Sequence, residues 1–172
     1  RDLDPLDRDT RLTHTLHEHL HRGIPRRLHR VAPMADPSQT IIDALTQLGL
    51  DTRRDPAGIW TTVPCSSRGP LAVVIAVAER SATLRTFVMR APDTRHEAVY
   101  RRVLRKNSEG GVWAFALDEL GDVFVLAQRP LALLDADGLD GVLGALSALV
   151  DEVFDGLVRL GFDIPPGVAI VP

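Results

Sequence analysis

Several residue types are scarce in this chain of 172 residues, and each scarcity excludes a class of protein. The single cysteine, Cys65, cannot form an intramolecular disulfide, which excludes a disulfide-stabilised scaffold. No apolar run approaches the roughly 18 residues that a membrane-spanning helix needs. Aromatic residues make up only 5% of the chain and the net charge is −3, so nothing indicates a nucleic-acid surface. We therefore expect neither a membrane nor a nucleic-acid partner.

Lysine is also nearly absent, because Lys106 is the only lysine among 20 basic residues. This bias is typical of GC-rich coding and indicates a high-GC bacterial genome. The remaining composition, with 45% hydrophobic and 25% charged residues, is ordinary for a globular protein. The length fits one domain. The sequence therefore predicts a folded domain of common composition.

The first 35 residues differ from the rest of the chain. They hold five of the six histidines and seven arginines, and Gly23-Ile24-Pro25 would break a helix there. We predict that residues 1–35 form a flexible or non-native extension, that residues 36–163 form the domain, and that 164–172 form a tail. No apolar segment typical of a secretory signal is visible, so we expect a cytoplasmic protein.

Hydrophobic periodicity predicts the elements of the domain. A helix opens at Asp36, which can cap it together with Gln39 in a capping box, and ends at Gly49. The further elements are strands over 59–63, 71–78 and 84–89, a helix over 94–107, strands over 112–117 and 123–128, and a long helix from Asp135 or Asp137 to Gly161. This order, α-β-β-β-α-β-β-α, predicts an α+β fold with an antiparallel sheet covered by helices. The strand over 71–78 is apolar on both faces and is therefore expected to be central.

Three glycines interrupt the predicted final helix. Gly141, Gly144 and Gly156 each cost about 1 kcal/mol relative to alanine inside a helix. We therefore expect another element to approach the helix closely at these positions.

A histidine-rich stretch gives the sharpest catalytic pattern. His17-Glu18-His19-Leu20-His21 matches the zinc-protease helix motif, and His14 could join His17 and His21 on one face. The stretch lies in the predicted extension, and no later helix offers a third ligand. We therefore favour solvated histidines and predict no metal site, no cofactor and no catalytic residue, with a metal-dependent hydrolase as an alternative.

Two other reactive groups have structural interpretations. Cys65 follows a strand with no histidine nearby in the sequence, which favours a small packed side chain over a nucleophile. Asp118, Glu119 and Asp122 cluster in the predicted hairpin turn, where the ligand number is too small for calcium. We interpret this cluster as a solvated turn.

Charge is distributed unevenly along the chain. Residues 80–106 carry eight basic and two acidic side chains, a sum of +6, whereas residues 120–172 carry two basic and eight acidic side chains, a sum of −6. The predicted basic helix contributes Arg95, Arg101, Arg102, Arg105 and Lys106. We predict that the two segments pair within the chain or between subunits.

Residues 97–160 resemble the YbjN family, whose fold is similar to that of type III secretion chaperones. The resemblance rests on the runs Tyr100–Asn107, Trp113–Asp118 and Gly121–Val123, and on the long helix with Leu139, Leu143 and Leu146. With the opening helix it extends over residues 38–162. It implies a compact α+β domain, often dimeric, without known catalytic residues, whose members are described as sensory-transduction regulators.

The expected function is therefore a non-enzymatic binding or regulatory module, a homodimer that recognises a protein or peptide. The sheet and its edge strands, or the apolar side of the first helix, would hold the partner, by addition of a strand for example. The predicted dimer or partner surface comprises Tyr100, Val103, Leu104, Trp113 and Phe115. A small-ligand sensor, with a pocket between the sheet and the long helix, is the alternative.

Overall fold

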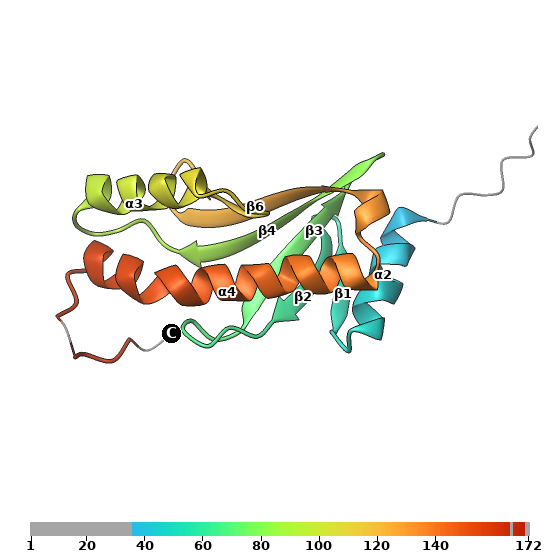
Figure 1. Cartoon of the computed structure of the whole chain (residues 1–172), viewed down its shortest axis with the longest axis horizontal. Helices are drawn as coiled ribbons and strands as arrows, with labels where there is room; N and C mark the ends of the chain where they lie inside the picture. The colour runs from blue at the N-terminus through green and yellow to red at the C-terminus, as the bar shows by residue number, and fades with distance from the viewer. Residues whose placement is uncertain (1–35, 166, 171–172) are drawn as a thin grey trace, which may run out of the picture. The chain divides into compact units, whose positions relative to one another are not determined.

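The longest element, α4 (Ala136–Gly161), runs across an antiparallel sheet, with α2 (Pro37–Gln47) beside one of its ends and α3 (His96–Ser108) beside the other (Figure 1). This computed structural model describes residues 36–165 and 167–170. Within these residues, both α2 and α3 contact α4, and no helix is both long and apolar enough to cross a bilayer. The histidines predicted as candidate ligands, His14, His17 and His21, lie outside the described residues, and the predicted domain boundaries stay predictions.

The sheet has six strands in the order β1-β2-β3-β4-β6-β5, and all neighbours are antiparallel. The strands are β1 (Thr52–Asp55), β2 (Gly58–Val63), β3 (Leu71–Val77), β4 (Ser81–Met89), β5 (Ala114–Leu117) and β6 (Val123–Pro130), and the short 3-10 helix η2 (Leu131–Leu133) leads from β6 to α4. The α+β class and the antiparallel sheet predicted from the sequence are confirmed. The apolar run over 71–78 is indeed a central strand.

The structure adds one strand to the predicted order, because β1 precedes the three strands that periodicity indicates. Its residues are Thr-Arg-Arg-Asp, so it offers no apolar alternation, and it pairs with β2 only. A two-residue turn joins β1 to β2, and the Asp55 carboxylate accepts a hydrogen bond from the Ala57 amide at 2.8 Å. At the start of β2, Gly58 has a φ of 144°, and a side chain there would collide with the Ile75 carbonyl. The turn, rather than hydrophobicity, forms this edge strand.

The core lies between the helices and one face of the sheet. Alternate strand residues such as Ile75, Leu84 and Val125 are buried there, against the apolar stripe of α4 that includes Leu146 and Leu157. This alternation is expected for a sheet covered on one side only. The side chains between them face away from the helices, and they form the surface that matters below.

The capping residues agree only in part with the prediction. Asp36 caps α2 by accepting a hydrogen bond from the Ser38 amide at 3.0 Å, but the Gln39 side chain donates to Asp43 at 2.8 Å and completes no capping box. For α4 the structure selects Asp135, whose carboxylate accepts a hydrogen bond from the Gly138 amide at 2.9 Å. The Asp36 half of the predicted capping box is therefore confirmed, and the Gln39 half is wrong because its side chain bonds to Asp43 in the next turn of α2.

The glycines of α4 divide into two kinds. At Gly156 a Cβ atom would lie 2.7 Å from the Arg102 guanidinium, so the expected close approach is confirmed. Gly141 and Gly144 have no heavy atom within 4 Å of a built Cβ, so the described residues make no close approach there. The expectation was wrong for these two positions because the exposed side of α4 is directed away from the sheet and α3.

Candidate binding surface on the open sheet face

The sheet face directed away from the helices carries a hollow of about 530 Å³. Its floor consists of small residues of β3, namely Ala72, Val74 and Ala76. Larger aromatic side chains line it on either side of β3: Trp60 on β2, and Phe87 and Phe124 on β4 and β6. We call this hollow the sheet trough.

Strand register places the trough residues on one face. Trp60 pairs with Val74, Val74 with Arg85, and Arg85 with Leu126, so these residues form one row across four strands. Directly paired residues of antiparallel strands have their side chains on the same side of the sheet. The row is therefore continuous across β2, β3, β4 and β6.

One wall of the trough is braced by aromatic packing. The rings of Phe87 and Phe124 meet edge to face, with centroids 5.5 Å apart. Phe87 is 36% exposed although it is large and apolar. Edge-to-face pairs of this kind hold both rings in place. The trough is thus a preformed apolar surface that nothing in the described part of the chain covers.

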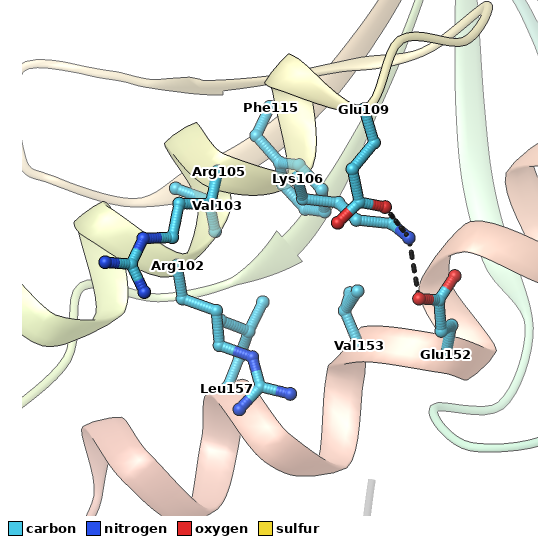
Figure 2. A pocket seen from close by; sticks show the side chains of 9 residues that line it. All are labelled: Arg102, Val103, Arg105, Lys106, Glu109, Phe115, Glu152, Val153 and Leu157. Carbon is cyan, nitrogen blue, oxygen red and sulfur yellow. Dashed lines mark hydrogen bonds and ion pairs between the residues drawn. The ribbon is translucent and has the colours of Figure 1, made fainter.

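A smaller hollow of about 240 Å³ lies between α3 and α4 (Figure 2). Val103 and Phe115 contribute to its apolar lining, and Lys106 lies at its rim. The Lys106 ammonium donates to Glu109 at 2.7 Å and to Glu152 at 2.6 Å, and these two carboxylates raise the pKa of Lys106. Because its lysine is already paired with two carboxylates, we interpret this hollow as a seam between helices.

The structure separates the five residues of the predicted dimer or partner surface. Trp113 is 6% exposed and its indole nitrogen donates to the Val142 carbonyl of α4 at 2.8 Å. Val103 and Phe115 are also buried in the core, and the half-buried Tyr100 hydroxyl donates to the Gly121 carbonyl at 3.2 Å. Leu104 differs, because 65% of it is exposed. Four of the five therefore pack within their own chain, and Leu104 alone offers a largely exposed apolar side chain.

The opposite charges of the two segments meet partly within the chain. Lys106 of α3 reaches Glu152 of α4, and Arg95 binds Asp163 at 2.8 Å beyond the end of α4. Arg101 instead pairs with Glu97 on its own helix. In each of these pairs at least one of the two charged side chains is largely exposed. Such exposed ion pairs stabilise a fold by about 1 kcal/mol or less. The predicted pairing thus exists, but only a few of the charges take part.

Cys65 lies in a small polar cluster that ties the loop after β2 to α4. The buried thiol donates to an Asp151 carboxylate oxygen at 3.2 Å, and the Ser67 amide donates to the same oxygen at 2.6 Å. These donors, the Ser67 amide first, lower the pKa of Asp151. The Cys65 side chain is thus buried and its hydrogen bond fastens this loop to α4. The structural interpretation of Cys65 is therefore favoured.

We expect Asp151→Asn to lower the melting temperature by a few degrees at pH 7. Because the folded pKa lies below the unfolded value of about 3.9, the aspartate contributes its stability above that value and loses it as the pH falls through the folded pKa. The difference between wild type and variant should therefore shrink below about pH 4. Thermal unfolding followed by circular dichroism at pH 7 and pH 3 checks this. A difference that grows towards pH 3 would contradict it.

The acidic turn of the β5–β6 hairpin also has a structural role. Asp118 accepts hydrogen bonds from the amides of Leu120 and Asp122, and Asp122 accepts one from the Ala91 amide at 2.7 Å. Among residues 36–165 and 167–170, no group of three histidine, cysteine, aspartate or glutamate side chains could hold a metal ion. These carboxylates therefore organise backbone amides.

The sheet is among the predicted partner surfaces, but the residues of the trough are not among the predicted site residues, although the sequence carries a signal for them. Ala72, Val74 and Ala76 are the second apolar face of the strand over 71–78. Periodicity identifies such a face but does not show whether a helix of the same chain covers it. From the sequence, this face is therefore expected to be buried within the domain.

Comparison with known proteins agrees with this architecture. The YbjN family model, described as "Putative bacterial sensory transduction regulator", matches residues 37–159. An uncharacterised protein of Mycobacterium tuberculosis is 36% identical over 107 residues, which are 62% of this chain and 58% of the relative. The match thus spans less than two thirds of the length of the relative.

Two solved complexes share the fold at low sequence identity. The Yersinia pestis type III secretion chaperone SycH, in complex with a stable fragment of YscM2, has a TM-score of 0.50 and 18% identity, with 69% of this chain and 99% of that chain covered. The ExsC–ExsE complex gives 0.50 and 17%, with 68% and 92% covered. The fold is therefore that of type III secretion chaperones, and the chain belongs to the YbjN family.

Proposed function

We propose that this protein is a non-enzymatic protein-binding module that holds an amphipathic helix of its partner in the sheet trough. The observation that carries the proposal is the uncovered apolar hollow lined by Trp60, Val74, Phe87 and Phe124. Exposed apolar patches of this kind commonly mark interaction sites. A regulatory role fits the description of the family, because a module of this kind can act by sequestering its partner.

The geometry of the trough favours a helix over an added strand. Both edges of β3 are already paired, with β2 on one side and β4 on the other, so no backbone hydrogen bonds are open to a new strand there. The distance from β2 to β4 is two strand spacings, or about 9.5 Å. An α-helix with its side chains is about 10–12 Å across, close to this spacing, and presents a stripe of apolar side chains. The trough therefore has the width and lining that a helix needs.

The fold neighbours support this proposal by what their structures contain. The SycH structure holds a fragment of a second protein, and the ExsC structure is a complex with ExsE. A sheet with helices on one side can thus serve as a protein-binding scaffold. The partner of the present chain is proposed from its own trough, and not from these pairs.

The test uses a synthetic helical peptide as the probe. The neutral-flank peptide has 18 residues, a leucine stripe, and alanine and glutamine elsewhere. We expect the full chain to bind it, and the trough variant Val74→Asp to lose that binding. Absence of binding to wild type, or equal binding by both proteins, would contradict the proposed function.

We further propose a homodimer through the α3 side of the molecule. Leu104 of α3 is 65% exposed and Leu120 of the β5–β6 hairpin is 79% exposed. α3 contacts β5, which is an edge strand with one free side. Exposed leucines beside a free strand edge favour self-association.

We expect Leu104→Asp to raise the dimer dissociation constant at least about tenfold, because it places a charge in an apolar contact. Sedimentation velocity over a range of concentrations measures this. Ala145→Asp is the matched control, since Ala145 is an exposed residue of α4. A wild-type monomer at high micromolar concentration, or an unchanged dimer in Leu104→Asp, would contradict the homodimer.

A further inference from the structure

Arginine side chains are stacked on the aromatic residues that line the trough. The Arg85 guanidinium carbon lies 3.8 Å from the Phe124 ring centroid. Arg53 lies 5.5 Å from the Trp60 centroid, and Arg68 lies 5.4 Å from that of Phe87. Stacking occupies the flat face of a guanidinium and leaves its N–H donors at the edges. Arg85 lines the trough itself, whereas Arg53 and Arg68 line neighbouring hollows and are linked to the trough by the rings that they cover.

Most of this charge is not neutralised by the part of the chain that the structure describes. Arg85 is the one charged residue among those that line the trough, and it has no ion pair there. Arg68 donates its Nε to the Val88 carbonyl at 2.8 Å and likewise forms no ion pair with the described residues. Arg53 has one carboxylate neighbour, Asp55, at 3.5 Å. Asp118 and Glu119 line a neighbouring hollow together with Arg85, but neither forms an ion pair with it in the described part of the chain. The lining of the trough itself therefore carries one charge, the positive charge of Arg85.

Arg85 holds the key position, because it shares a cross-strand row with Val74 and Leu126. A helix whose leucine stripe covers Val74 would bring its flanking residues over Arg85. A glutamate or aspartate there could accept two N–H bonds from the guanidinium, the favoured geometry for this pair. A lysine or arginine at the same place would meet a like charge in a partly desolvated setting, which is unfavourable.

We infer that the partner helix is acidic, with aspartate or glutamate on both sides of its apolar stripe. This inference rests on the proposed function. The proposed function specifies that the partner segment is a helix, and the inference specifies that this helix is negatively charged. Charge complementarity of this kind sets specificity and association rate more than total affinity. The same arginines would also attract an anionic membrane surface, so the test includes that case.

The test compares three peptides on the full chain by fluorescence anisotropy. They share one leucine stripe and differ only in the flanks, which carry glutamate, glutamine or lysine. We expect the glutamate peptide to bind at least about tenfold more tightly than the lysine peptide at low salt, with a smaller ratio at 1 M salt. Arg85→Gln should reduce this ratio several-fold. Arg105→Gln, an exposed arginine of α3 at the other hollow, is the control and should leave it unchanged.

The outcomes distinguish a failure of the acidic-partner inference from a failure of the proposed helix-binding function. Equal binding of all three peptides, abolished by Val74→Asp, would overturn the acidic partner and leave the helix-binding trough standing. Binding of no peptide would overturn both. A ratio that Arg85→Gln leaves intact would also overturn the inference. So would binding of wild type to phosphatidylglycerol vesicles without any preference among the peptides, because the charge would then serve a membrane.

Discussion

Trp113→Ala is expected to lower the free energy of unfolding by about 3–5 kcal/mol, the typical cost of deleting a large buried aromatic side chain. The indole of Trp113 is 6% exposed and fills space between the sheet and α4. It also donates to the Val142 carbonyl at 2.8 Å, so its loss removes both packing and a hydrogen bond to α4. Urea unfolding followed by circular dichroism measures the change.

Two variants distinguish this core role from a surface role. Trp113→Phe keeps much of the apolar volume and loses the hydrogen bond, so it should cost less than the alanine variant. Leu133→Ala removes a side chain that is 49% exposed and lies outside the proposed dimer contact, so it should change stability by about 0.5 kcal/mol or less. If Trp113→Ala kept near wild-type stability and instead changed the oligomeric state, the position of Trp113 in this structure would be contradicted.

Val74→Asp is expected to weaken binding of the neutral-flank peptide by about 100-fold or more. Val74 lies in the floor of the trough, so a helix seated there would bury the new carboxylate. Arg85 lies directly across from it and can pair with it, but the apolar helix would then desolvate both charges, which costs several kcal/mol. Each 1.4 kcal/mol is a factor of about ten in affinity. Isothermal titration of the full chain with the peptide measures the effect.

The fold should tolerate this substitution. Val74 faces away from the core, so the aspartate of the free protein remains in contact with water. We expect a melting temperature within a few degrees of wild type. Ala145→Asp introduces the same charge on the exposed side of α4 and should bind the peptide as wild type does. Similar losses of binding in both variants would show that net charge, and not the trough, controls binding.

Sequence patterns predicted the elements that bury an apolar face of their own. Ile41 and Leu45 recur at helical spacing and lie in the core, and so does the long stripe of α4. The sequence pattern does not reveal β1, because a strand at the edge of the sheet needs no apolar residues. β1 is held by the turn that joins it to β2 and by its backbone hydrogen bonds to that strand. Periodicity reports burial, and β1 is mostly exposed.

The binding surface was harder to predict because one sequence pattern permits two outcomes. Trp113 and Phe115 were predicted at a partner surface, yet they are buried within the chain by α3 and α4. Val74 and Ala76 were assigned to a buried strand, yet no described element covers them. Which of two apolar faces the helices cover depends on chain connectivity and on the twist of the sheet. Neither can be derived from local spacing.

The chain has two tryptophans, and they make one measurement decisive. Trp60 lines the trough, whereas Trp113 is buried and bonded to the Val142 carbonyl. The indole N–H signals of ¹⁵N-labelled protein, assigned with Trp60→Phe and Trp113→Phe, can be followed while the neutral-flank peptide is added. A helix seated in the trough should shift the Trp60 signal progressively and leave the Trp113 signal in place. A shift of Trp113 alone, or of neither signal at saturating peptide, would contradict binding at the open sheet face.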